Sequence, residues 1–141
     1  MTDTLTPEER SERMSRIRSR DTKPELALRR ALHRLGFRFR VNARQLPGKP
    51  DIVLPKYRTV IFVHGCFWHR HLGCKIASTP KSNTAFWEEK FERNVERDRS
   101  VEERLVQMGW DVIVAWECEL ETAKKLEEKA SEIAGKLRNA L

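Results

Sequence analysis

The stretch "DIVLPKYRTVIFVHGC", residues 51–66, decides the fold. Its two short apolar runs, "DIVLP" and "TVIFV", are bounded by turn or polar residues, which predicts a hairpin of two buried strands. A third apolar run, "WDVIVAWE" at residues 110–117, predicts another buried strand, and "FRFRV" at residues 37–41 alternates like a half-buried one. With helices before, between and after these strands, the pattern predicts an α/β or α+β fold around one sheet.

The first helix is predicted from its end signals. Thr22 and Glu25 fit a capping box, with Pro24 in the first turn, where proline is tolerated. Apolar residues then recur on one face to about Leu35, and Gly36 is a typical stop signal.

Two longer helices are predicted further along the chain. One should begin near Asn83 or Thr84, either of which could cap it, and end near Gly109. The other covers "ELETAKKLEEKASEIAGKL", residues 119–137, with mixed surface charge. The interval "VHGCFWHRHLGC", residues 63–74, lies between the second strand and the long helix and is expected to be an irregular loop.

The composition is that of a globular domain. The 141 residues are 39% hydrophobic and 35% charged, without a run of 18 apolar residues or an apolar signal-peptide core. We therefore expect an intracellular, cytoplasmic protein, with a basic N-terminal arm over residues 1–21 and a single domain over residues 22–141. The net charge is +7, and residues 1–50 hold 13 Lys and Arg against 6 Asp and Glu. A basic segment beside a neutral body indicates a grip on a polyanion, or else a solvated tail.

The cysteines suggest a metal site. Cys66, Cys74 and Cys118 cannot all pair within one monomer, and Cys118 directly follows the third predicted strand. Three cysteines and one histidine form a common ligand set for structural zinc, whereas the alternative is buried free thiols. Spacing does not choose the histidine, for which the candidates are His33, His64, His69 and His71.

Two aspartates are candidate site residues. Asp51 stands at the mouth of a predicted strand, where it could hold Mg²⁺ at a phosphate or simply close a turn. On the long helix, Asp98 falls within about 20° of Trp87 and Leu105, inside the apolar stripe. A buried acid needs a partner, either a histidine in a catalytic pair or an arginine such as Arg40 in a structural bond.

Large aromatic residues surround these candidates. Phe67 and Trp68 lie in the 63–74 interval, and Trp87 opens the long helix. Such residues usually pack on the core, but in DNA-binding proteins they also stack on bases or wedge between them.

In combination, these motifs resemble a known family. The segments "LPGKPDIV", "VIFVHGCFWH", "FWEEK" with "NVERDR", and "VAWEC" are similar to those of the very short patch repair (Vsr) DNA mismatch endonucleases. The resemblance runs from about Met14 to Cys118, in order and with sensible spacing, and the pairing of "HGCFWH" with "NVERDR" is specific.

The resemblance implies a fold and an activity. The fold would be restriction-endonuclease-like, related to the PD-(D/E)xK nucleases, with a mixed central sheet flanked by helices and one structural zinc. The activity would be magnesium-dependent nicking of duplex DNA on the 5′ side of the thymine in a T:G mismatch, which arises when 5-methylcytosine deaminates. Where the usual nuclease signature has an acid and a lysine, this chain has Phe62, Val63 and His64.

The resemblance also implies residue roles. Asp51 and the Val63 carbonyl would bind Mg²⁺, His69 would be the general base oriented by Asp98, His64 would assist, and Glu25 would act through a water molecule of the magnesium ion. The zinc ligands would be Cys66, His71, Cys74 and Cys118. The DNA-contacting residues would be Phe67, Trp68 and Trp87 from the major groove and Met14 from the minor groove.

Partners and rival functions follow from the same reading. The expected partner is T:G-mismatched duplex DNA, with contacts to general mismatch-repair proteins as a family expectation, and the protein is expected to be a monomer near the nucleoid and away from membranes. One rival is a nuclease of the same fold that acts on another mismatch or on branched DNA. The other is a zinc-stabilised DNA-binding module without chemistry, in which His69 and Asp98 would be dispensable.

Overall fold

The structure, a computed structural model, has one mixed sheet at its centre. It describes residues 22–41, 43–71, 74 and 81–139, except for the side chain of Trp68. The strands are β1 (Arg40–Val41), β2 (Ile52–Leu54), β3 (Thr59–His64) and β4 (Asp111–Trp116), in the order β1-β2-β3-β4. The first three strands are antiparallel, and β4 is parallel to β3.

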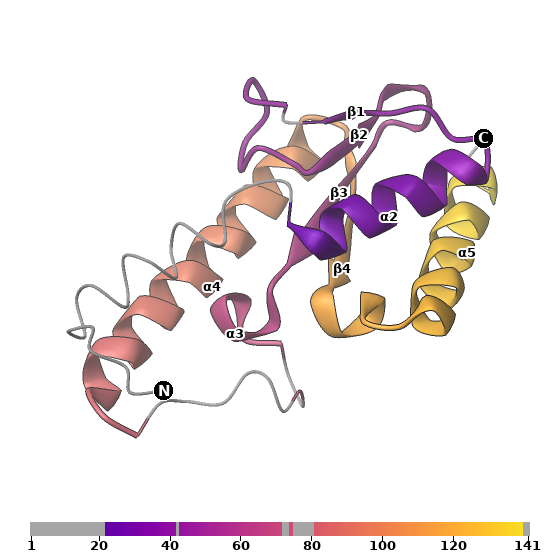
Figure 1. Cartoon of the computed structure of the whole chain (residues 1–141). Coiled ribbons are helices and arrows are strands. Elements are labelled where there is room, and N and C mark those ends of the chain that lie inside the picture. The colour runs from indigo at the N-terminus through magenta and orange to yellow at the C-terminus, as the bar shows by residue number, and fades with distance from the viewer. Residues whose placement is uncertain (1–21, 42, 72–73, 75–80, 140–141) are drawn as a thin grey trace.

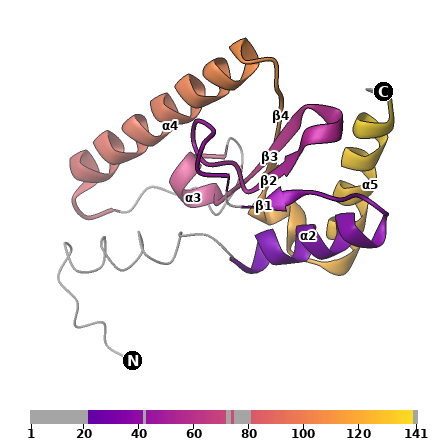
Figure 2. The same cartoon turned by 90° about the horizontal axis from the view of Figure 1, so that it is seen from above.

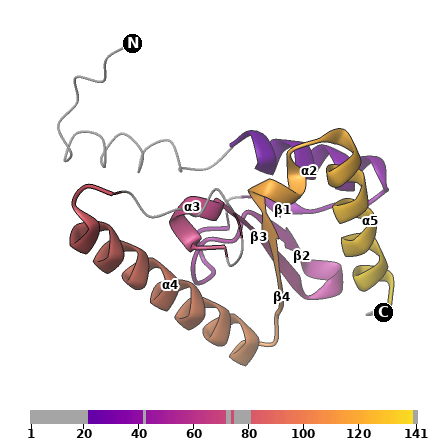
Figure 3. The ribbon, with the colours of Figure 1, turned by 90° about the horizontal axis from the view of Figure 1, so that it is seen from below.

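Helices cover both faces of this sheet. Figure 1 shows α4 (Thr84–Gln107) on one side and α2 (Lys23–Arg34) with α5 (Ala123–Asn139) on the other. The views from above and below agree (Figures 2 and 3). The long crossover through α4 is what lets β4 run parallel to β3. The predicted mixed α/β architecture, with a mixed sheet flanked by helices, is therefore confirmed.

The strand period divides the core between the two faces. Because successive side chains of a strand alternate, Ile61 points to the α2 and α5 side, whereas Val60 and Phe62 point to the α4 side. The register pairs His64 with Trp116 at the ends of β3 and β4. Neighbours in register share a face, so both rings stand on the α4 side of the sheet.

The predicted long helix lies close to its observed bounds. Asn83 occupies the N-cap position, and Gly109, with φ of +92°, follows the helix end. Trp87, Phe91, Asn94 and Leu105 are buried along one face, as the helical period requires. Val95, at the margin of that stripe, is 45% exposed.

The N-terminal end of α2 differs from the prediction. Thr22 is at the N-cap, but its side chain makes no capping bond. Glu25 turns inward instead, is 4% exposed and pairs with Arg29 at 3.2 Å between Nη2 and Oε2. The predicted capping box is wrong because burial against the rest of the protein takes the Glu25 carboxylate away from the helix end. Capping therefore does not explain why a glutamate stands at position 25.

Only part of "FRFRV" pairs as a strand. Phe37 is buried in the core, while Arg38 Nη1 donates to the carbonyls of His33 and Phe37 near the end of α2. Exposure alternates from Phe37 to Arg40 but not at Val41, which is 39% exposed. Because β2 offers only three residues, the ladder is restricted to Arg40 and Val41.

Three short elements were not predicted. They are the 3-10 turns η1 (Pro55–Tyr57) and η3 (Glu117–Leu120) and the four-residue helix α3 (Cys66–His69), which lies in the interval expected to be irregular. Among the described residues, no helix is long and apolar enough to span a membrane.

The basic charge is concentrated more narrowly than the sequence reading proposed. Residues 22–50 hold 8 Lys and Arg against 1 acid, whereas residues 1–21 hold 5 of each. The segment 1–21 is arginine-rich but carries no net charge, so its description as basic is corrected. The excess lies on α2, β1 and the loop to β2.

Candidate active site and metal centre

A cleft of about 660 Å³ opens at the end of β3, between the sheet and α4. We call it the Asp51 cleft. Although they come from five separate parts of the chain, the residues predicted for catalysis and for magnesium all line it. These are Glu25, Asp51, Val63, His64, His69 and Asp98.

Asp51 is held at the cleft by the neighbouring strand. It directly precedes β2, and the backbone N–H of Val63 donates to its Oδ2 at 2.6 Å. The turn before it depends on Gly48, with φ of +72°, where an added Cβ would collide with Val101 of α4. The Asp51 carboxylate thus replaces the ladder partner that β2 no longer supplies.

The electrostatics at Asp51 favour a bound cation. Burial raises the pKa of Asp51 from 3.8 to about 7, the Val63 N–H opposes that rise, and the nearby charge of Glu25 adds to it. Keeping two charged carboxylates largely out of water costs free energy unless a positive charge compensates them. Arg29 supplies part of it through its ion pair with Glu25.

His69 and Asp98 form a close pair across the cleft. His69 Nδ1 and Asp98 Oδ2 are 2.5 Å apart, and their side chains are 18% and 27% exposed. The α3 turn carries His69 there, since the His69 N–H donates to the Gly65 carbonyl at 3.1 Å. Of the two partners considered for Asp98, the structure selects a histidine and not Arg40.

His64 stacks on the same imidazole. The His64 and His69 rings are parallel, with centroids 3.9 Å apart and an interplanar angle of 5°. His64, His69 and Asp98 place possible ligand atoms within 4.8 Å of one another. However, imidazole lone pairs lie in the ring plane, so a metal in the plane of one stacked ring lies outside that of the other. The geometry therefore favours an Asp–His pair with a stacked histidine over a chelate of all three.

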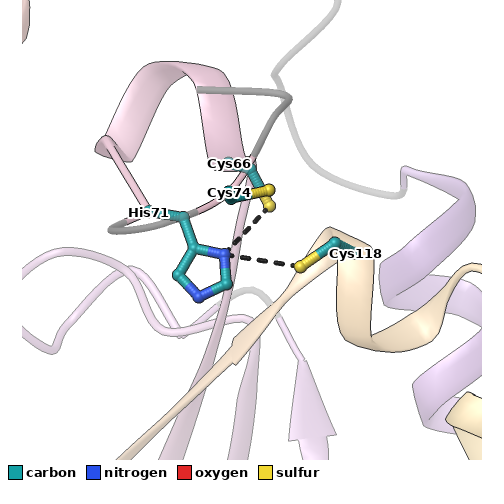
Figure 4. A group of neighbouring side chains, drawn as sticks. All are labelled: Cys66, His71, Cys74 and Cys118. Carbon is teal, nitrogen blue, oxygen red and sulfur yellow. Dashed lines mark hydrogen bonds between the residues drawn. The ribbon is translucent and has the colours of Figure 1, made fainter. Parts of the chain in front are cut away.

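A second cluster joins the start of α3 and the residues after that helix to η3. The ligand atoms of Cys66, His71, Cys74 and Cys118 lie within 4.8 Å of one another, and we call this group the cysteine cluster. Figure 4 shows His71 Nδ1 facing the sulfurs of Cys66 and Cys118, which are 3.6 and 3.4 Å away. A tetrahedral zinc requires nitrogen–sulfur separations of about 3.5 Å, from bond lengths near 2.0 and 2.3 Å.

The chemistry of these thiols also fits a metal. Burial raises the pKa of Cys66 to about 12, and burial raises that of Cys118 as well. Three crowded thiols become thiolates together only if a cation compensates the charge. Glu117 supports the cluster without being part of it, because its Oε1 accepts a hydrogen bond from the backbone N–H of Cys66 at 2.8 Å.

Phe67 and Trp87 do not line the Asp51 cleft. Phe67, Trp87 and Phe91 pack edge to face or stacked, with centroids 5.0 to 5.8 Å apart. Trp87 is only 7% exposed, and the Arg70 guanidinium lies 4.0 Å from the Phe91 ring centroid. In this conformation Phe67 and Trp87 pack against the rest of the protein, and their contacts with DNA stay predictions. Met14 and the Trp68 side chain lie outside the described residues.

Sequence reasoning missed several residues near these sites. Trp116 lies between the two clusters, and Arg44, Lys49 and Arg97 line the Asp51 cleft. The sequence signal for Trp116 was its place in "VAWEC", two residues before the predicted zinc ligand Cys118. Its importance depends on the β3–β4 register, which the sequence alone does not define.

Comparison with known proteins identifies the group. The family described as DNA mismatch endonuclease Vsr matches residues 2–75. The type II nicking enzyme V.XorIIP of Xanthomonas oryzae is 49% identical over 133 residues, covering 94% of this chain and 97% of its own. V.NmeAIP of Neisseria meningitidis is 46% identical over the full length of both chains. The DNA mismatch endonuclease Vsr of Escherichia coli is 47% identical over 121 residues, covering 86% and 77%.

The class of protein is thus a DNA endonuclease, in agreement with a cleft that combines carboxylates and a histidine–aspartate pair. Within that class, the chain belongs to the Vsr DNA mismatch endonuclease family.

Proposed function

We propose that the protein nicks duplex DNA on the 5′ side of the thymine in a T:G mismatch, and so starts very short patch repair. The observation that carries this proposal is the meeting of Asp51 with the His69–Asp98 pair in one cleft. Family membership supports mismatched DNA as the substrate. The four-stranded mixed sheet with helices on both faces is in keeping with a restriction-endonuclease-like fold.

His69 is suited to accept a proton in this cleft. If Nδ1–H donates to Asp98, Nε2 is the nitrogen that accepts a proton from an attacking water. Asp98 thereby selects the tautomer and stabilises the imidazolium that forms. The stacked His64 ring limits rotation of the His69 ring and borders the same cleft.

Asp51 is the residue proposed to hold Mg²⁺, assisted by the Val63 carbonyl. In a strand, the N–H and C=O of one residue point to the same side, and the Val63 N–H points at Asp51. Mg²⁺ at these oxygens would stabilise the charge that develops on the phosphate. Glu25 adds negative charge beside Asp51, and we propose that it would bind a water molecule of the magnesium ion.

The cysteine cluster is proposed to hold one structural zinc. Its donor set and separations suit tetrahedral zinc, and its four protein ligands leave no open position for substrate. This closure fits a structural role: the zinc would hold α3, and with it His69, against the sheet.

The DNA partner is supported by charge. The +7 excess on residues 22–50 includes Arg44 and Lys49, which line the Asp51 cleft, and Arg29, which pairs with the cleft residue Glu25. A T:G wobble pair stacks less well than a matched pair, so wedging by Phe67, Trp68, Trp87 and Met14 would cost less there. A monomer, contacts with general mismatch-repair proteins and a place near the nucleoid remain part of the proposal.

A panel of duplexes tests the proposal. Supercoiled or short duplex DNA carrying T:G, other mismatches, a branch or no defect is incubated with protein and Mg²⁺, and products are resolved by strand. We expect one nick, 5′ of the T in T:G. Asp51→Ala should abolish nicking while binding persists, and Asp111→Ala, an exposed aspartate at the opposite end of the sheet, should not.

Each rival has its own outcome. Equal cleavage of branched DNA or of another mismatch would assign a different substrate to the same site. Binding without product at any Mg²⁺ concentration would indicate a DNA-binding module. Wild-type nicking by Asp51→Ala would refute the catalytic assignment.

A further inference from the structure

Trp116 connects the two clusters through direct ring contacts. Its indole stacks on His71 with centroids 4.3 Å apart and an interplanar angle of 8°. The same indole meets His64 edge to face, with centroids 5.3 Å apart at 75°. His64 in turn stacks on His69 at 3.9 Å. A continuous series of rings therefore leads from the cysteine cluster to the His69–Asp98 pair.

The backbone explains how this series is assembled. His64 and Trp116 are register partners at the ends of β3 and β4, so their rings stand side by side on one face of the sheet. His69 and His71 are two residues apart in the next segment. Each of them covers one member of the pair, His69 over His64 and His71 over Trp116.

Trp116 is itself fixed from the opposite side of the sheet. Its backbone N–H donates to Glu119 Oε1 at 2.9 Å, and Glu119 Oε2 lies 3.3 Å from Lys129 Nζ of α5. The η3 turn that begins at the next residue also carries Cys118. The indole position is thus tied both to the C-terminal helix and to a predicted zinc ligand.

We propose that Trp116 is a positioning residue that sets the ring orientation of His64 and, through His64, that of His69. The inference rests on the proposed function, because it assigns His69 as the proton acceptor. The flat indole presents one face to His71 and meets the His64 ring edge to face at 75°. A smaller aliphatic side chain would leave space beside both rings and let His64 rotate. His69 would then lose the parallel surface that opposes its own rotation.

The kinetic test compares Trp116→Leu, Trp116→Phe and a matched control, Trp110→Leu. Trp110 is partly buried on the same sheet face, near the start of β4, about 20 Å along the strand from Trp116. Single-turnover nicking of a T:G duplex with Mg²⁺ gives the rate and the half-saturating DNA concentration separately. Zinc content per chain is measured on the same samples.

We expect Trp116→Leu to keep its zinc and its half-saturating DNA concentration within about twofold, while the nicking rate falls at least about tenfold. Trp116→Phe, which restores a flat ring, should recover most of that rate, and Trp110→Leu should match the wild type. An unchanged rate for zinc-loaded Trp116→Leu would overturn the inference. Equal losses in Trp116→Leu and Trp110→Leu would overturn it as well, because they would indicate general packing.

A second measurement does not depend on activity. Histidine ring resonances are recorded by NMR for the zinc-loaded wild type and for each folded Trp116 variant, including Trp116→Phe if Trp116→Leu does not fold. Because both rings touch Trp116, the His71 and His64 resonances should shift whether or not Trp116 positions His69. The inference further requires the His69 resonances to shift, and unchanged His69 signals would overturn it. A wild type that does not nick T:G DNA would refute the proposed function instead, and the NMR result would still decide the positioning.

Discussion

The Asp51 cleft and the cysteine cluster stand on either side of the His64–Trp116 ring pair, and both depend on residues 63–74. The cleft is open, is lined by oxygen donors and imidazoles, and places a carboxylate where burial raises its pKa to about 7. The cysteine cluster contains soft donors at separations that suit a closed tetrahedral site.

The difference separates catalysis from stability within one short segment. A site that must admit phosphate and water retains unfavourable electrostatics when it is empty, and a cation or substrate compensates them. A site that only stabilises the fold needs no open position, so all of its ligands can bind the metal. Mutations in the two clusters should therefore affect different observables.

The largest effect is expected in the cysteine cluster. Cys118→Ser removes one of the four proposed zinc ligands, so we expect zinc loss and a fall in Tm on the order of 10 °C. Thermal unfolding with metal analysis measures both. Wild type treated with chelator should fall to the Tm of the variant, and chelator should not lower the variant further. A normal Tm for zinc-free Cys118→Ser would show that the cluster does not stabilise the fold.

The opposite pattern is expected at Asp98. Asp98→Asn keeps the side-chain size but removes the charge that would stabilise the imidazolium in the proposed proton transfer to His69, so nicking should fall by about 100-fold. Zinc content and Tm should stay at wild-type values. Glu103→Gln, an exposed acid on the same helix, is the control and should nick normally. A wild-type nicking rate for Asp98→Asn would show that His69 does not need the Asp98 carboxylate for its proposed role.

Features with a regular period were predictable from the sequence. The apolar runs at 52–54 and 59–63 became β2 and β3, and the helical period placed Asp98 toward the core before its partner was known. The position of Asp51 at the start of a strand was predictable because the strand begins after a proline-containing turn, whereas its proposed role came from the family resemblance. These inferences of position need only local spacing.

Features that depend on long-range contacts were not predictable in the same way. Helix α3 has four residues and thus too few positions to show a period. Spacing could not distinguish His69 from His71. The family resemblance assigned their roles, and the fold places His69 against Asp98 and His71 among the cysteines. Glu25 fitted a capping box in sequence, but burial beside Asp51 determined its actual position.

The raised pKa of Asp51 should make the stability of the protein depend on pH. Between the ordinary pKa of 3.8 and about 7, folded Asp51 retains a proton that the unfolded chain has lost. The folded state therefore binds more protons, and the stability of metal-free protein should fall as pH rises through that interval. Asp51→Asn, which keeps an acceptor for the Val63 N–H, should be more stable than wild type at pH 8 by roughly 2 kcal/mol.

Urea unfolding at pH 4 and pH 8, without magnesium, measures this difference. The two proteins should have nearly equal stability at pH 4, where Asp51 is protonated in the folded wild type. Adding Mg²⁺ at pH 8 should stabilise the wild type and leave the variant unchanged. A stability difference that does not vary with pH would contradict the account of Asp51.

The smallest effect is expected on the basic surface that leads away from the cleft. Arg29, Arg30, His33 and Arg34 line a groove on α2 with Phe39, and Arg29 connects it to Glu25. If this surface follows DNA phosphates, the Arg30→Ala/Arg34→Ala double variant should weaken binding about fivefold at moderate salt, near 1 kcal/mol.

The dependence on salt is the more specific measurement. Loss of two phosphate contacts should reduce the slope of log K against log salt by about 2, equally for T:G and matched duplexes. Lys124→Ala/Lys136→Ala on α5 removes the same charge from a helix that also carries several glutamates, so the slope should not change. An equal change in both double variants would assign the effect to net charge, and the α2 groove would have no specific part in binding.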